Sequence, residues 1–296
     1  MKKPIPIKDR SDLRAYRQAA LLGAPPIAYL LVFFALPILY LFVAGLKTPD
    51  PTAFIGADWT FANYTDILSD GYYLGVIVRT LGSGLGIVLI ALIIGYAAAY
   101  KMESLKPQTR TWFLLLFLFP LMVSNVVRAY GWMAILGRTG VLNTSLRAVG
   151  YDGPPLRILF SMEAVVIGLM TILLPYMVIS VLNALNTIDR RYREAAASLG
   201  ASPWRTFWHI TLPLSAPGVL TGTLLVFLLT LSAYITVSLL GGPRFKLLVS
   251  LVFDAVQTFQ WAKASVLSFI LLALALGVSV ILILALRPAG AGGRSK

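Results

Sequence analysis

EAAASLGASPWRTFWHITLP, residues 194–213, interrupts an apolar chain with charge, three consecutive alanines, a glycine, a Ser-Pro pair and two tryptophans. Apolar runs that are long enough to cross a bilayer flank this stretch on both sides. The chain has 296 residues, of which 58% are hydrophobic and only 12% are charged, about half the charged fraction of a soluble domain. In water such a chain would expose too much apolar surface. The sequence therefore predicts an integral membrane protein.

Six windows predict membrane-spanning helices, because a span needs about 20 mostly apolar residues. The windows are 20–46, 76–99, 112–136, 161–183, 214–240 and 265–287. Their apolar runs are continuous rather than alternating, which indicates helices and not the strands of a barrel. The first run is too long for the core of a signal peptide, so we expect it to be retained. The predicted fold is an all-α polytopic membrane protein with six transmembrane helices.

Lys and Arg set the expected orientation. If both termini are cytoplasmic, the inside segments hold sixteen of the 25 Lys and Arg and the outside loops hold seven. We therefore expect a cytoplasmic tail over 1–19, a six-helix domain over 20–287 and a cytoplasmic tail over 288–296. The net charge of +13 is thus explained by Lys and Arg that set the orientation in the membrane. We therefore expect the chain to contact membrane lipid and not nucleic acid.

The loop over about 184–213 is then cytoplasmic, and its residues predict a helix, a tight turn and a second helix. Thr187 can cap the first helix, and Gly200 is placed to end it in a left-handed conformation. Ser202 can cap the second helix, and Pro213 is expected to stop that helix near the membrane.

Small side chains in the first loop helix leave room for another protein to approach its backbone. Ala195, Ala196 and Ala197 provide this room, and Glu194 provides a polar anchor beside them. This pattern indicates a docking element. The alternative is an interfacial helix that rests on lipid headgroups through its aromatic and Arg side chains.

The loop resembles the EAA loop of binding-protein-dependent ATP-binding cassette (ABC) importer permeases. The motif is Glu-Ala-Ala, three residues, Gly, nine residues, Ile, one residue and Leu-Pro. Here it falls on Glu194, Ala195, Ala196, Gly200, Ile210, Leu212 and Pro213. The resemblance implies that these residues, with Ser202, form coupling helices that sit in a cleft of an ATPase subunit.

Four further segments extend the likeness over roughly residues 20–287. They are VVRAYGW (126–132), GVLN (140–143), LLPYMV (173–178) and LLGG (239–242). Together they resemble the first permease of the spermidine/putrescine importer group, whose neighbours carry opines, gamma-aminobutyrate, aminophosphonates or ferric iron. The resemblance implies the type I ABC importer (MetI-like) architecture in a bacterial inner membrane. It also implies a second homologous permease subunit, two ATPase subunits and an extracytoplasmic solute-binding protein, with a polyamine as cargo.

The chain lacks the motifs of an enzyme. No G-x-x-x-x-G-K-[ST] phosphate loop is present, so ATP hydrolysis and Mg-ATP are expected in the partner ATPase subunits and no cofactor is expected in this chain. The GSGLG stretch at 82–86 lies inside an apolar span, where Gly82 and Gly86 indicate helix packing. Without Cys, and with His209 as the only histidine, neither a metal site nor a catalytic triad is expected.

Charges within the spans indicate a candidate substrate path. Arg79, Arg128 and Glu163 are expected at a similar depth near the external mouth if each span is a straight helix. Arg128 shares a helical face with Asn125 and Trp132. Two readings remain open: these charges screen cargo, or they are structural, with Arg128 and Glu163 paired and Arg side chains reaching the outer headgroups.

The fifth span adds Ser232, Tyr234 and Thr236 to the candidate path. Aromatic faces suit a polyamine, and Tyr130, Trp132, Tyr234 and Trp261 offer them. Acids near the outer mouth after the first loop are limited to Glu163 and Asp254, whereas the two Arg suit an anion better.

A rival class is a stand-alone secondary transporter, which typically shows an internal repeat with paired broken helices or midplane charges. The sequence shows neither feature. A purely structural scaffold, the third class, leaves the EAA spacing unexplained.

Overall fold

The computed structural model describes residues 21–50 and 56–286. Over these residues the chain is all-α, and its only sheet-like contact is one bridge between Lys47 and Trp59. The elements before the middle of the chain are η1 (Leu31–Ala35), α2 (Leu36–Gly45), α3 (Ala62–Ser69), α4 (Gly71–Glu103), α5 (Pro107–Leu118), η2 (Phe119–Met122), α6 (Asn125–Leu136) and α7 (Val141–Ala148). The remaining elements are α8 (Met162–Asn186), α9 (Arg190–Ser198), α10 (Pro203–Thr206), η3 (Phe207–Thr211), α11 (Leu212–Leu231), α12 (Tyr234–Gly241), η4 (Gly242–Arg244), α13 (Leu248–Gln257) and α14 (Trp261–Ala285).

Five helices in the described ranges are long and apolar enough to cross a membrane. They are Leu21–Gly45, Gly71–Glu103, Met162–Asn186, Pro203–Leu231 and Trp261–Ala285. The pair Pro107–Met122 and Asn125–Ala148 is apolar enough as well but is bent by 97°, as in a broken span or a re-entrant loop. The predicted class of fold is confirmed, with five spans, or six if the bent pair counts as one. The predicted tails, 1–19 and 288–296, lie outside the described residues.

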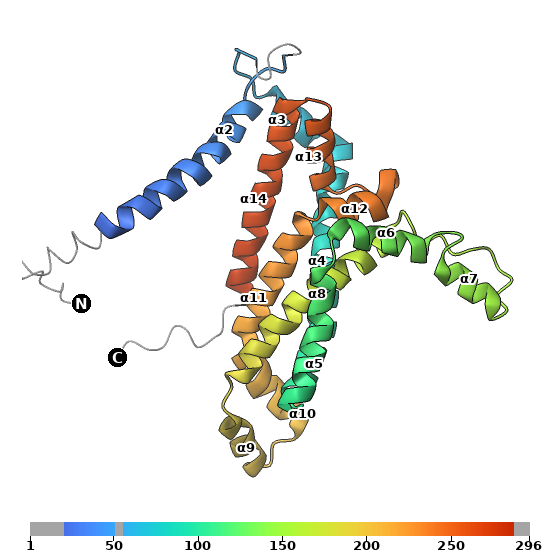
Figure 1. Ribbon diagram of the computed structural model, residues 1–296. Helices are drawn as coiled ribbons and strands as arrows, with labels where there is room; N and C mark the ends of the chain where they lie inside the picture. The colour runs from blue at the N-terminus through green and yellow to red at the C-terminus, as the bar shows by residue number, and fades with distance from the viewer. Residues whose placement is uncertain (1–20, 51–55, 287–296) are drawn as a thin grey trace, which may run out of the picture.

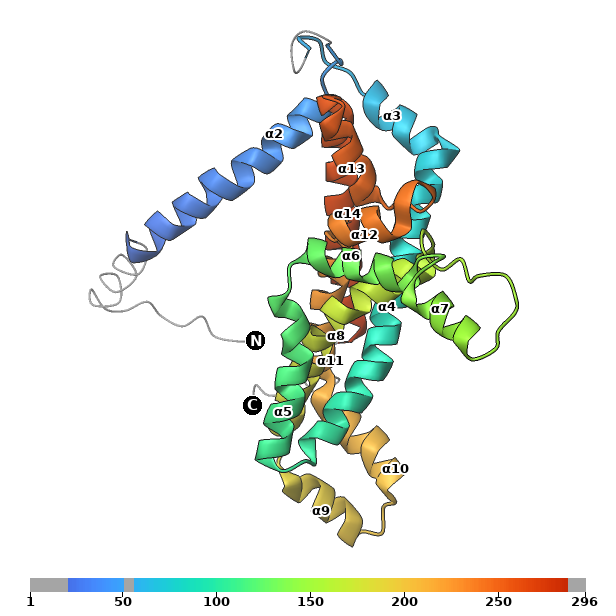
Figure 2. The ribbon, with the colours of Figure 1, turned by 45° about the vertical axis from the view of Figure 1, so that its right-hand side comes forward.

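The predicted straight third span, 112–136, is wrong. Val123 and Ser124 have extended backbone, with ψ of 134° and 140°, and they separate η2 from α6. Pro120 has no amide hydrogen to donate, which weakens the helix just before the break. Figures 1 and 2 both show α6 lying across the long axis of the molecule.

The predicted fifth span, 214–240, is also broken. The helix of α11 ends at Leu231, and α12 begins at Tyr234 after the non-helical Ala233. The Ser232 hydroxyl donates to the Leu229 carbonyl at 3.1 Å, which satisfies one of the carbonyls at the end of α11. Two of the predicted spans are therefore interrupted by short non-helical segments.

The core lies where α4, α8 and α11 pack together, around fully buried side chains such as Ile87, Leu169 and Phe227. Glycine allows the closest approach of α8 and α11. A Cβ at Gly218 would lie 2.4 Å from the Ala184 Cβ, so no larger residue fits there without a shift of the backbone.

The predicted packing role of Gly82 and Gly86 is wrong within this chain. A Cβ at either position would meet no atom within 4 Å. It is Gly84 that faces the core, where a Cβ would lie 3.2 Å from the Phe227 ring. Gly82 and Gly86 therefore lie on a different face of the helix from Gly84, the glycine that contacts the core.

The first and last spans lie at the side of this core. Figure 2 shows α2 tilted away from the other helices, with its C-terminal end near α13 and α14. Large apolar side chains along the whole span Leu21–Gly45, such as Leu30 and Phe33, are more than half exposed. Along the chain the spans run in alternating directions, and α9 and α10 lie together at the lower end of the molecule in Figure 1, which we call the loop end.

Candidate functional site

The first loop helix, α9, begins at a cap other than the predicted one. The Asp189 carboxylate accepts from the Arg191 backbone N–H at 2.9 Å and is the true N-cap. Thr187 instead follows α8 as its C-cap, and its hydroxyl donates to the Ala184 carbonyl at 2.7 Å. The prediction for Thr187 is wrong because α8 continues into the loop and occupies the residues before it.

Gly200 ends α9 as predicted, with φ of +79°. The Gly200 N–H donates to the Ala197 carbonyl at 2.9 Å, and the Ala201 N–H donates to the Ala196 carbonyl at 3.0 Å. This pair of bonds is the Schellman motif, in which a left-handed residue closes the helix and satisfies its last carbonyls. The turn fixes the angle between the two halves of the loop.

The second half of the loop begins as predicted, and Ser202 accepts from the Arg205 N–H at 3.3 Å. It does not stop at Pro213. Helix α10, the π-helical η3 and α11 form one continuous helix over Pro203–Leu231. Pro213 lies in the first turn of α11, directly after the π-helical turn, where its missing N–H is tolerated. The second loop helix is therefore a direct extension of a span.

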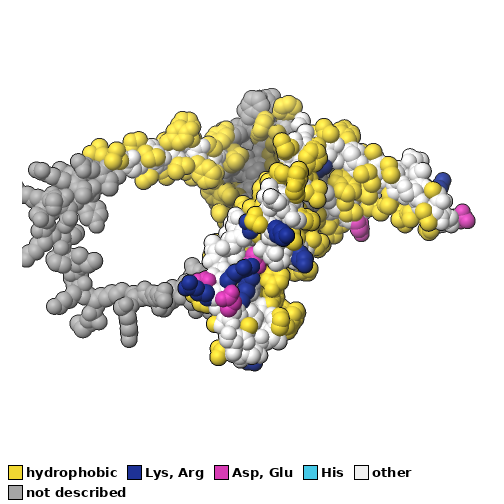
Figure 3. Space-filling model, turned by 60° about the horizontal axis from the view of Figure 1, so that its bottom comes forward, with side chains coloured by type: hydrophobic (Ala, Val, Ile, Leu, Met, Phe, Trp, Pro, Cys, Tyr) yellow, Lys and Arg dark blue, Asp and Glu magenta, His cyan; other side chains and the backbone are white. Residues whose placement is uncertain are grey.

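Much of the loop surface is exposed in this chain. Glu194, Ala195 and Gly200 are exposed, and Leu199 is 88% exposed. Ala196 faces inward and is buried. Of the remaining motif residues, Ile210 and Leu212 are half-buried at the start of the span and Pro213 is exposed. Figure 3 shows Lys and Arg side chains gathered at the loop end. Exposed apolar and polar groups on one short helical hairpin suit contact with another protein.

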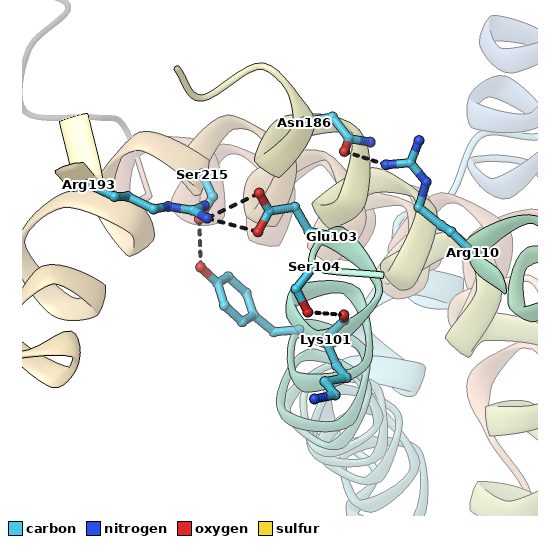
Figure 4. Close-up of polar contacts among 8 residues, drawn as sticks. Lys101, Glu103, Ser104, Arg110, Asn186, Arg193 and Ser215 are labelled. Carbon is cyan, nitrogen blue, oxygen red and sulfur yellow. Dashed lines mark hydrogen bonds and ion pairs between the residues drawn. The ribbon is translucent and has the colours of Figure 1, made fainter. Parts of the chain in front are cut away.

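Helix α9 is tied to the end of α4 by an ion pair that the sequence reading missed. The Arg193 Nη1 donates to both Glu103 carboxylate oxygens, at 2.8 and 3.1 Å (Figure 4). The two side chains are only 23% and 14% exposed. Among the described residues, the only other ion pair joins Lys246 to Asp254. The signal in the sequence was a lone acid at the end of the second span.

Aromatic rings tie the other half of the loop to the same helix. The Phe207 ring meets Tyr96 and Tyr100 edge to face, with centroids 5.6 and 5.4 Å apart. The Tyr96 hydroxyl also lies 2.9 Å from the Ser215 hydroxyl of α11, a buried hydrogen bond. These contacts were not identified from the sequence.

A cavity of about 620 Å³ opens where the two broken helices meet α8, and we call it the helix-break cavity. It brings together five of the eight predicted path residues: Asn125, Arg128, Ser232, Tyr234 and Thr236. Irregular backbone within a membrane protein is expected where it lines such a cavity. The stacked rings of Tyr234 and Phe253, 3.8 Å apart, form part of its wall.

The other three path residues lie outside this cavity. Arg79 is exposed, and its guanidinium lies 5.7 Å from the centroid of the Phe245 ring. Glu163 is exposed in the first turn of α8. Trp132 packs against the core. The predicted common depth of Arg79, Arg128 and Glu163 relied on straight spans and does not bring them together.

Arg128 does not pair with Glu163, so the predicted structural pair is wrong. One guanidinium nitrogen of Arg128, Nη2, donates to the Val123 carbonyl at the break between η2 and α6. Its Nε and Nη1 are buried and have no hydrogen-bond partner among the described residues. No carboxylate lines the helix-break cavity within the described ranges. Arg128 therefore stabilises the break through Nη2, and its other two donors are buried in the wall of the cavity.

A second cavity, of about 590 Å³, lies at the end of the molecule opposite the loop. Three of the acids from the first long loop line it, Asp50, Asp66 and Asp70, together with Tyr73 and Lys263. The Lys263 ammonium lies 5.4 Å from the centroid of the Tyr73 ring. Acidic and basic side chains thus share this entrance region.

Comparison with known proteins gives the family. Residues 87–287 match the family described as binding-protein-dependent transport system inner membrane component. The chain is 34% identical over 217 residues to the spermidine/putrescine transport system permease protein PotB of Haemophilus influenzae, covering 73% of this chain and 76% of that protein. It is also 34% identical over 218 residues to PotB of Escherichia coli K12, covering 74% and 79%.

A solved structure shares the fold. A chain in the crystal structure of a bacterial alginate ABC transporter, in complex with an alginate pentasaccharide-bound periplasmic protein, aligns with a TM-score of 0.76. The alignment covers 94% of this chain and 96% of that chain, at 18% sequence identity. The likeness extends well beyond the loop, to nearly the whole molecule.

Proposed function

This chain belongs to the family of binding-protein-dependent transport system inner membrane components, and on that basis we propose that it passes a polyamine such as spermidine or putrescine from a solute-binding protein into the cytoplasm. It is a multi-pass inner-membrane permease subunit of an ABC importer and not an enzyme. The cargo is inferred from the two PotB relatives, at 34% identity.

The observation that carries the permease role is the exposed loop hairpin at one end of the spans. Its turn at Gly200 is fixed by the Schellman bonds, and its second helix continues into the span that ends beside the helix-break cavity. A rigid hairpin joined to the cavity wall is suited to transmit movement from an ATPase to the path of the solute.

The assembly that we propose contains a second homologous permease, two ABC ATPase subunits and an extracytoplasmic solute-binding protein. Mg-ATP binds in the ATPase subunits, which dock on the loop through Glu194, Ala195 and Gly200. The loop end, with both chain termini, faces the cytoplasm. The alternating direction of the spans supports this arrangement, together with the bias of Lys and Arg toward the loop end.

The helix-break cavity offers a polyamine aromatic faces rather than charge. A primary or secondary ammonium can lie over the Tyr234 and Phe253 rings, which are stacked 3.8 Å apart, and gain cation–π attraction. Side chains of Asn125 and Ser232 supply hydrogen-bond acceptors beside them. Weak, distributed contacts of this kind suit a path through which a solute must leave again.

One observation favours a second cargo, an anionic or zwitterionic solute such as an opine, gamma-aminobutyrate or an aminophosphonate. Arg128 places two buried donors beside a cavity that no described carboxylate lines. A guanidinium recognises carboxylate and phosphonate oxygens through paired hydrogen bonds, and it repels an ammonium.

Uptake by the assembled transporter separates the two cargoes. The complex is reconstituted in proteoliposomes with its binding protein outside and ATP inside, and radiolabelled putrescine is supplied. Polyamine transport predicts ATP-dependent uptake that unlabelled spermidine suppresses and gamma-aminobutyrate does not. Uptake of labelled gamma-aminobutyrate with no uptake of putrescine would refute the polyamine proposal and support the second cargo.

A further inference from the structure

The loop hairpin has one helical segment before the turn at Gly200 and one after it, and we call the whole hairpin the coupling loop. Both segments contact the same short part of α4. Tyr96, Tyr100 and Glu103 are spaced four and three residues apart, so they lie on one face of the last two turns of that helix. Arg193 of α9 contacts Glu103, and Phe207 of η3 contacts both tyrosines.

From this geometry we infer that Arg193, Glu103 and Phe207 form a clamp that makes α4 move with the coupling loop, so that Arg193 and Glu103 are positioning residues for transport. The inference rests on the proposed function, since it concerns how docking of an ATPase is transmitted to the spans. We call these three residues, with Tyr96 and Tyr100, the α4 clamp.

Chain connectivity explains why such a clamp is needed. The second half of the loop is continuous with α11 over Pro203–Leu231, so any movement of α10 carries α11 with it. Helix α9 is not continuous with α8, because Thr187–Asp189 separate the two helices. The turn at Gly200 joins α9 to α11 but not to α4, so without a side-chain link the hairpin and α11 could move with the ATPase and leave the end of α4 in place.

The ion pair is short and mostly shielded from water. Arg193 reaches both Glu103 oxygens from Nη1, while its Nε and Nη2 are buried without a hydrogen-bond partner among the described residues. The Arg193 guanidinium also lies 5.9 Å from the centroid of the Tyr100 ring. A shielded pair contributes little to stability but is expensive to break, because the remaining charge is left buried. It therefore fixes geometry more than it stabilises the fold.

The clamp then extends into the core. The Tyr96 hydroxyl bonds to Ser215 of α11, 2.9 Å away, and Ser215 also donates to the Leu212 carbonyl at 3.0 Å. The end of α4 is thus joined to both α9 and α11 within two turns. The loop, α4 and α11 are held as one body at the loop end, and α4 and α11 both pack into the core.

The test measures transport and hydrolysis together in the reconstituted complex. Glu103→Gln keeps the shape of the side chain and removes its charge, and we expect solute transported per ATP to fall about tenfold, the effect of a coupling energy typical of contacting charged residues. Co-purified ATPase and its rate of hydrolysis are expected to be unchanged. The double swap Glu103→Arg with Arg193→Glu is expected to restore coupling that either single reversal abolishes.

Lys101→Gln is the matched control, because Lys101 is an exposed charge on the same turn with no ion pair among the described residues. It is expected to behave as the unaltered chain. Unchanged transport per ATP in Glu103→Gln would overturn the clamp, and so would a loss that the double swap fails to restore.

A distance measurement distinguishes a clamp from a residue that only supports the fold. The chain has no Cys, so a double variant with Lys101→Cys on α4 and Arg190→Cys on α9 carries spin labels at these two positions only. The clamp predicts one narrow distance that is the same without nucleotide and with trapped nucleotide, and that broadens in Glu103→Gln. A distance that changes between the two states of the clamped protein would overturn it. Failure of any ATPase to co-purify with the unaltered chain would instead refute the proposed function.

Discussion

Gly200 is the residue on which the geometry of the loop depends. Its φ of +79° lies in the left-handed region, where a β-branched side chain is strained by about 1–2 kcal/mol or more. A Cβ at this position would meet no other atom within 4 Å, so the cost of a substitution comes from the backbone and not from a clash. The effect of a larger side chain can therefore be read as a change in the turn.

Gly200→Val is expected to leave the protein in the membrane, to reduce ATPase docking and to abolish uptake, because α9 can no longer end in the Schellman turn. Gly200→Asn is the control, since Asn tolerates the left-handed conformation at low cost. The measurements are ATPase co-purified with the tagged chain and ATP-dependent uptake. Normal docking and uptake in the Val variant would show that this turn does not position the coupling surface.

Arg128 acts at the break between η2 and α6 and beside the helix-break cavity. Arg128 makes no ion pair among the described residues, and Gln retains N–H donors that can replace the bond to the Val123 carbonyl, so Arg128→Gln is expected to leave the assembly intact. It should raise uptake of cationic relative to anionic solutes roughly tenfold, the equivalent of about 1.4 kcal/mol. Glu163→Gln is expected to change neither stability nor preference. Competition between labelled putrescine and gamma-aminobutyrate measures the ratio, and an unchanged ratio in Arg128→Gln would exclude contact with the solute.

The long connection between α6 and α8, which includes α7, is held together by one buried side chain. Asn143, in the GVLN segment, is 4% exposed. Its amide donates to the Gly137 and Leu156 carbonyls at 3.0 Å each, and its oxygen accepts from the Leu156 N–H at 2.8 Å. A single side chain thus joins Gly137, at the beginning of this long connection, to Leu156, which lies thirteen residues after Asn143.

Asn143→Ala is expected to lower the free energy of unfolding by about 1–3 kcal/mol, since it leaves buried backbone groups without partners. The neighbouring Thr144 is exposed, and Thr144→Ala is expected to have little effect. Thermal unfolding of the purified protein in detergent measures both variants. Equal midpoints for Asn143→Ala and the unaltered chain would show that the connection is held by other contacts.

Sequence reasoning succeeded for elements that depend on local chemistry. Long apolar runs predicted the spans, and the turn at Gly200 and the cap at Ser202 follow from backbone preferences of single residues. It failed where tertiary contacts decide. The breaks at 123–124 and 232–233 lie inside apolar runs, and the hydrophobicity that predicts a span carries no sign of them. The Arg193–Glu103 pair joins residues 90 positions apart, which no local pattern reveals.

At the scale of the whole molecule, the first and last spans leave most of their apolar surface exposed. The window of the first span is 6% buried and that of the last is 11% buried, whereas those of the α8 and α10–α11 spans are 50% buried. Lipid alone can cover such helices, and we propose that an ATPase subunit covers the exposed loop hairpin at one end. The fold therefore describes one subunit of an assembly, with its core on one side and its contact surfaces at the loop end and along the outer spans.

We propose that this chain acts only with an ATPase bound at its loop end. Affinity purification of the tagged chain from its own membranes, followed by measurement of the mass of the intact complex, tests this proposal directly. We expect a complex that contains a second permease and two ABC ATPase subunits, and that loses the ATPase subunits in Gly200→Val. A chain that purifies without any ATPase, and still carries solute across a vesicle membrane, would contradict it.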